Sequence, residues 1–70
     1  MNPSMSIIKI RTSLVYKQMD ALSLSTDELA SAIGLSNQAL ITILSLGKCT
    51  VITAGRLSKI LDIHLWELIR

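Results

Sequence analysis

Apolar residues recur at intervals of three and four along most of the chain, and short polar or glycine-containing breaks interrupt them. This spacing puts apolar side chains on one stripe of a helix, whereas a half-buried strand alternates every second residue. Half of the residues are hydrophobic and only 17% are charged, so the stripes can bury enough surface to offset the chain entropy. The pattern predicts a folded all-α protein and excludes a disordered or low-complexity segment.

The 70 residues are enough for one small domain, and no repeat or linker divides them. A domain of this size buries only about 60% of the surface that its unfolded chain exposes, so it needs reinforcement. Cys49 has no disulfide partner and His64 is the only imidazole, which excludes disulfide-rich and zinc-finger folds and leaves no expected metal or cofactor. We therefore expect a homodimer that buries the last turn and the segment with Ile7, Ile8 and Ile10.

No apolar run approaches the roughly 20 residues that cross a bilayer. The start Met1-Asn2-Pro3-Ser4 lacks the basic segment that precedes the apolar part of a secretory signal. We expect a soluble protein of a reducing cytoplasm with no membrane partner.

The first predicted helix ends near Leu22. Its stripe contains Ile8, Thr12, Val15, Met19 and Leu22. Two starts are open. Asn2-Pro3 can cap and open this helix, since proline suits the first helical position, whereas the alternation from Ser6 to Arg11 also allows a short arm or edge strand.

The next two helices have clear end signals. Ser25-Thr26-Asp27-Glu28 is a capping box that starts a short helix, and Gly34 ends it in the left-handed conformation. Ser36 can cap a third helix over residues 37–46, which Gly47 terminates. The two helices then meet across a three-residue turn, with Leu40, Ile43 and Leu44 turned inward.

Thr50 can cap a fourth helix, and a last turn or two follows Asp62-Ile63. The fourth helix runs through Ala54, Leu57, Ile60 and Leu61. The last turn runs through Leu65, Trp66, Leu68 and Ile69.

The run Leu29-Ala30-Ser31-Ala32-Ile33-Gly34-Leu35-Ser36, followed by Leu40 and Ile43, resembles the helix-turn-helix of the phage repressor and Cro family of DNA-binding regulators. The small Ala30 lets the two helices cross closely, Gly34 takes the turn, and the apolar residues hold the angle. Three later segments are also similar to the family: Leu44–Lys48, Leu57–Ile63 and Trp66–Ile69. The resemblance covers about Leu14 to Ile69.

This resemblance implies a compact five-helix, lambda-repressor-like domain, with the helix-turn-helix unit at about residues 26–46 and an arm or helix start in residues 1–10. It further implies a transcriptional regulator, a repressor of a phage or mobile element, that binds double-stranded DNA at a two-fold symmetric operator. The base-reading residues would be Asn37, Gln38, Ile41 and Thr42, whose chemistry suits A·T pairs. The phosphate contacts would be Thr26, Ser36, Ser45, Lys48 and Thr50.

A function other than DNA binding is also consistent with the sequence. Between Lys17 and Lys48 there is no basic residue, while the three acidic residues of that segment give it a formal charge of −3, and phosphate binding relies on Lys and Arg. Ile41 and Leu46 would also suit a protein partner. The alternative is a protein-interaction module of the same fold, such as an antagonist or partner of a repressor.

No nucleophile with a base in reach, Gly-rich phosphate loop or carboxylate pair is evident, so we expect no enzyme activity. Cys49 follows a lysine, which could lower its pKa, but an inert thiol is favoured. His64 is expected as a cap or surface residue, and Trp66 as a core or subunit contact. Arg56 and Lys59 are expected on a solvated helix face.

Overall fold

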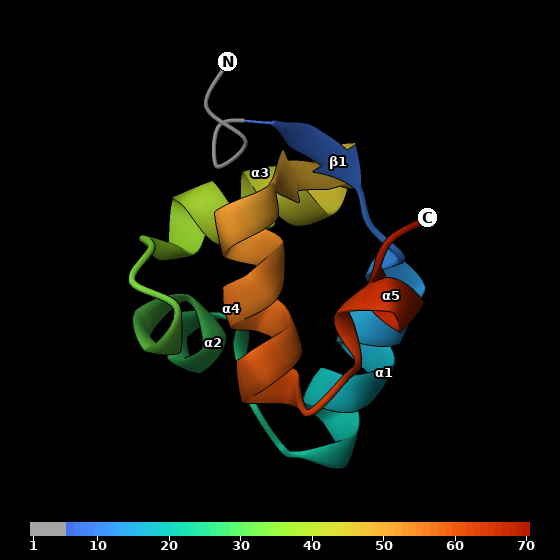
Figure 1. The fold of residues 1–70 in the computed structure, drawn as a ribbon. Coiled ribbons are helices and arrows are strands. Elements are labelled where there is room, and N and C mark those ends of the chain that lie inside the picture. Colours follow the sequence, from blue (N-terminus) through green and yellow to red (C-terminus); the bar gives the residue numbers. More distant parts are fainter. Residues whose placement is uncertain (1–5) are drawn as a thin grey trace.

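The structure is a computed structural model and describes residues 6–70 (Figure 1). Within them the chain forms five helices and one two-stranded sheet. The elements in chain order are β1 (Ile7–Lys9), α1 (Thr12–Ala21), α2 (Thr26–Ala32), α3 (Asn37–Leu46), β2 (Lys48–Thr50), α4 (Val51–Leu61) and α5 (Leu65–Leu68). The fold is therefore mostly helical, but it is not strictly all-α as expected, because β1 and β2 form a small sheet.

The segment before α1 is a strand. β1 pairs antiparallel with β2, with Ile8 opposite Cys49, and its β-branched residues suit an extended backbone. α1 begins only at Thr12, so Ile8 does not belong to its stripe, and Leu22 at its C-terminal end is exposed rather than buried. The expected helix start at Asn2-Pro3 lies outside the described residues.

The predicted N-caps of three helices are confirmed. Ser25 Oγ accepts from the Glu28 backbone N–H at 3.1 Å, and Glu28 Oε1 accepts from the Ser25 N–H at 3.0 Å, which completes the capping box of α2. Ser36 Oγ accepts from the Ala39 N–H at 3.1 Å at the start of α3. Thr50 Oγ1 does the same for the Thr53 N–H of α4 at 3.2 Å.

α2 and α3 are bent by 102° relative to each other. The chain turns between them through residues 33–36, with Gly34 at a φ of 77°, a left-handed value that an L side chain rarely adopts. Leu29 of α2 and Leu40 of α3 are both fully buried. Gly47, at a φ of 70°, ends α3 as expected.

α4 runs through the middle of the view in Figure 1, with α2 on one side of it and α1 and α5 on the other. Its residues Leu57 and Leu61 are fully buried, whereas Ile60 is partly exposed. Trp66 is 73% exposed, which excludes a core position for it. Among residues 6–70 the buried apolar residues are Ile10, Val15, Met19, Leu29, Ala30, Ile33, Leu40, Leu44, Cys49, Ala54, Leu57, Leu61, Ile63 and Leu68.

The segment after β1 lies against the last residues of the chain. Ile10 and Ile69 form an isolated antiparallel bridge. The Arg11 N–H donates to the Leu68 carbonyl at 2.7 Å, and the Arg70 N–H donates to the Lys9 carbonyl at 3.0 Å. These backbone bonds join two segments that are almost the whole chain apart in sequence.

Among residues 6–70, no single helix is long and apolar enough to cross a membrane. α2 and α3 reach the required length and composition only when they are taken together as a bent pair.

Candidate functional site

One face of α3 is exposed and carries most of the residues predicted to contact bases. Gln38, Ile41, Thr42 and Ser45 are all exposed, and their spacing of three and four places them on the same side of the helix. Leu40 and Leu44 lie on the opposite side and are buried. Ile41 is 40% exposed, so the outward face is partly apolar.

The hydroxyl of Thr42 is tied to its own helix. Its Oγ1 donates to the Gln38 carbonyl at 3.0 Å, one turn earlier, which is a common arrangement for threonine within helices. The groups left for an outside contact are the oxygen lone pairs and the γ-methyl. A methyl group of this kind can contact the thymine methyl.

Asn37 differs from the other three predicted base-contacting residues. Its side chain is only half-exposed, and its Oδ1 is buried without a hydrogen-bond partner. A bidentate pair with adenine needs both the amide oxygen and the amide nitrogen of asparagine. The orientation in the structure does not present this pair, so Asn37 would have to rotate to make it.

The five predicted phosphate contacts fall into different environments. The Thr50 hydroxyl accepts from the Thr53 N–H and donates its only hydrogen to Thr53 Oγ1 at 3.0 Å, so this hydrogen is already engaged at the α4 cap. Ser36 Oγ is engaged as the α3 cap. Thr26 is the half-buried first residue of α2. Ser45 and Lys48 line the same cavity.

This cavity lies at the C-terminal end of α3 and has a volume of about 310 Å³. Its lining residues are Lys9, Ile10, Thr12, Leu44, Ser45, Leu46, Gly47, Lys48 and Arg70. Three of them are basic and none is acidic. Lys9 lies directly opposite Lys48 in the sheet register, and the Arg70 N–H donates to the Lys9 carbonyl at 3.0 Å.

Sequence reasoning missed Lys9 and Arg70 as parts of this site. Each lies far from Lys48 in the sequence, and no local pattern marks either residue. Both reach the end of α3 because β1 pairs with β2 and the last residues pair with the segment around Lys9. Both residues add positive charge at the end of α3. This charge compensates for the lack of basic residues between Lys17 and Lys48.

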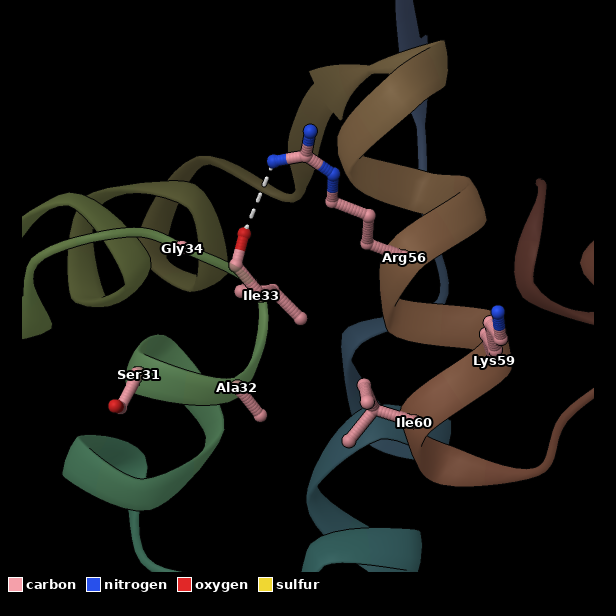
Figure 2. Close-up of a pocket in the computed structure, with 7 residues that line it drawn as sticks. All are labelled: Ser31, Ala32, Ile33, Gly34, Arg56, Lys59 and Ile60. Carbon is pink, nitrogen blue, oxygen red and sulfur yellow. Dashed lines mark hydrogen bonds between the residues drawn. The ribbon is translucent and has the colours of Figure 1, made fainter.

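A second cavity, of about 410 Å³, separates the end of α2 from α4 (Figure 2). Its lining residues are Ser31, Ala32, Ile33, Gly34, Arg56, Lys59 and Ile60. Arg56 Nη1 donates to the Ile33 carbonyl at 3.2 Å, which satisfies one of the carbonyls left free at the end of α2. Arg56 is exposed as predicted, but its guanidinium also ties α4 to the turn between α2 and α3.

Cys49 lies in β2 and is buried. Burial raises the pKa of its thiol. This effect outweighs any lowering by the neighbouring lysine, so a reactive thiolate is disfavoured at neutral pH.

His64 precedes α5 without a side-chain cap bond, and its ring stacks on that of Trp66 at 5.6 Å between centroids. Within residues 6–70, no group of three His, Cys, Asp or Glu side chains could hold a metal ion.

Comparisons of the chain with protein-family models, with curated proteins and with solved structures give no match.

Proposed function

We propose that the protein is a sequence-specific transcriptional repressor that binds double-stranded DNA through the major groove. In this proposal α2 and α3 are the helix-turn-helix unit of a lambda-repressor-like domain, and α3 is the recognition helix. The observation that carries the proposal is the exposed face of α3, where Gln38, Ile41 and Thr42 share one side of the helix, with the basic cavity at its C-terminal end.

The shape of the α2–α3 pair supports the proposal. Its bend of 102° falls within the range of about 90–120° that is typical of helix-turn-helix units. α3 has ten residues, or about 15 Å at 1.5 Å per residue. An exposed helix of this kind fits the major groove of B-DNA, which is about 12 Å wide.

The side chains of α3 suggest how bases would be recognised. The Gln38 amide is exposed and can pair bidentately with the N6 and N7 atoms of adenine. The methyl groups of Ile41 and Thr42 suit the thymine methyl. Together they favour a half-site rich in A·T pairs, with Asn37 contributing only after its amide rotates.

Phosphate contacts would come mainly from the end of α3. Lys48 and Ser45 share the basic cavity, and Lys48 supplies the charge on which phosphate binding depends. Ser36 and Thr26, at the starts of α3 and α2, would contribute backbone N–H groups and a hydroxyl. The engaged hydroxyl of Thr50 leaves it the weakest member of the set.

We further propose a cytoplasmic homodimer on a two-fold symmetric operator, without a cofactor or enzymatic activity. The exposed apolar residues outside α3, discussed below, support a subunit contact.

The test is selection from a random duplex library at two salt concentrations, followed by two variants. Gln38→Ala should relax the preference at one base pair per half-site and weaken binding there by about 1–3 kcal/mol, because a bidentate pair is lost. Lys48→Ala should weaken binding to all sequences alike and reduce the slope of log affinity against log salt by about one per protomer. If no duplex is enriched at about 50 mM salt, the proposal is wrong.

Two exposed apolar residues favour a second candidate function, which is binding of another regulator by the same fold. Ile41 is 40% and Leu46 66% exposed, and apolar side chains of this kind form the centres of protein interfaces. Under this alternative Ile41→Lys should abolish a complex with an identified protein partner, because it forces a charge into a desolvated contact. The same alternative predicts that Gln38→Ala leaves that complex unchanged.

A further inference from the structure

Three cationic residues from separate parts of the chain line the cavity at the end of α3. Lys9 comes from β1, Lys48 from β2 and Arg70 from the last residue of the sequence. Backbone hydrogen bonds fix their main chains. The Ile10 N–H donates to the Gly47 carbonyl at 2.9 Å and the Arg70 N–H to the Lys9 carbonyl at 3.0 Å. The gathering of these residues is therefore set by the fold.

Fold stability does not explain this arrangement. Lys9 and Lys48 are direct cross-strand partners, and like charges in that position destabilise a strand pair. The carbonyl end of a helix attracts cations, but its dipole amounts to only about half a negative charge. That is too little to neutralise three cations, and no Asp or Glu side chain lines the cavity.

The neutral groups of the cavity suit an anion as well. Thr12 and Ser45 line it and carry hydroxyls that can donate to oxygen. Arg70 carries a planar guanidinium, which can bind two oxygens of a phosphate at once. An anion between Lys9 and Lys48 would also relieve their mutual repulsion.

We infer that this cavity binds a phosphate group, with Lys9, Lys48 and Arg70 as its charged contacts. Under the proposed function, on which this assignment of the source rests, the group is a phosphate of the DNA backbone at the C-terminal end of α3. Lys9 and Arg70 then hold the duplex from outside the recognition helix, and they make up for the missing basic residues between Lys17 and Lys48.

The first experiment uses inorganic phosphate and the full chain. Phosphate is titrated into ¹⁵N-labelled protein, with sodium chloride at matched ionic strength as the reference. The amide signals of Lys9, Ser45, Lys48 and Arg70 should shift saturably with phosphate and not with chloride. Lys9→Gln and Arg70→Gln should each weaken this binding severalfold. Wild-type shifts identical in phosphate and chloride would overturn the inference.

The matched control is Lys17→Gln, which removes the same charge from an exposed position on α1 that does not line the cavity. It should bind phosphate like the wild type. Thermal unfolding of each variant shows whether it is folded, and because Lys9 and Arg70 are both exposed, two independent substitutions test the same site. If all three variants lose phosphate binding equally, net charge and not the cavity is responsible, and the inference is wrong.

The second experiment identifies the source of the phosphate group. Lys9→Gln and Arg70→Gln should each lower the slope of log affinity against log salt for duplex DNA by about one per protomer, and Lys17→Gln should leave it unchanged. If the wild type binds phosphate in the cavity but no duplex at about 50 mM salt, only the proposed function is wrong. If it binds duplex while Lys9→Gln and Arg70→Gln behave like Lys17→Gln in both experiments, only the inference is wrong.

Discussion

Two adjacent residues of α3 differ sharply in burial, because one lies on the inner face of the helix and the other on its outer face. Leu40 is fully buried, whereas the next residue, Ile41, is 40% exposed. The two side chains have the same number of carbon atoms and similar hydrophobicity. Any difference between their truncated variants therefore reports the position of each residue in the fold.

Leu40→Ala should lower the free energy of unfolding by about 2–5 kcal/mol, because it removes buried surface and leaves a cavity. Ile41→Ala should change it by no more than about 0.5 kcal/mol, as is usual for surface positions. Urea unfolding followed by circular dichroism measures both values. If Ile41→Ala is the more damaging change, the rotation of α3 about its axis is wrong.

Among the helices, α2 depends strongly on its N-terminal cap. It has only seven residues, and a helix so short is not stable by itself in water. The reciprocal bonds between Ser25 and Glu28 satisfy two backbone N–H groups at its start. The hydrogen bond from the Ser25 N–H, with a further contribution from the Ser25 hydroxyl, holds the pKa of the Glu28 carboxyl below its ordinary value.

This lowered pKa predicts how the contribution of Glu28 depends on pH. Its stabilisation is fully present above the pKa of the carboxyl in the unfolded chain, near 4.5, and is lost as the pH falls through the lower folded pKa. Glu28→Gln removes the titration, so its melting temperature should fall less than that of the wild type between pH 6 and pH 3. Asp27→Asn, at the adjacent exposed position, serves as the control. Equal falls in the wild type and Glu28→Gln would contradict the prediction.

Elements marked by local signals were predicted well from the sequence. The caps at Ser25, Ser36 and Thr50 and the glycine at position 47 involve residues no more than a few positions apart, so a single stretch of chain specifies them. The sheet is different, because β1 needs a partner that lies far along the chain. Its short alternation allowed an arm, a strand or a helix extension, and only the pairing with β2 selects the strand.

In the candidate site, too, some features follow from local sequence and others depend on long-range contacts. The outward face of α3 follows from helical spacing, so Gln38, Ile41 and Thr42 could be predicted as exposed. The orientation of the Asn37 amide depends on the packing around it. The basic cavity depends on two long-range pairings, which bring Lys9 and Arg70 to Lys48, and no spacing along the sequence encodes them.

At the scale of the whole molecule, several large apolar side chains remain on the surface. Trp66 is 73% and Ile7 62% exposed. Ile10, which was expected to belong to this apolar surplus, is buried in the core instead, because it lies between the end of α3 and the bridge to Ile69. Within the two segments expected to form the dimer contact, the most exposed apolar side chains are therefore Trp66 and Ile7.

We expect sedimentation equilibrium at tens of micromolar to show a species of about twice 7.7 kDa. Trp66→Ser and Ile7→Ser should separate the two surfaces, since the change that lies in the subunit contact should shift the protein toward the monomer. The other change serves as its control. A single 7.7 kDa species, together with an operator without two-fold symmetry, would contradict the dimer.

The antiparallel contact between residues 9–11 and 68–70 has a consequence for ligand binding. It closes a loop of nearly the entire chain for only a few backbone bonds, so we expect it to open more readily than the core, as weakly held segments do. Lys9 and Arg70 lie on opposite sides of this contact. A phosphate group that binds both would hold the two ends together, so binding and closure are thermodynamically linked. Hydrogen exchange at the Ile10 and Arg70 amides should then slow in proportion to the occupancy of the cavity.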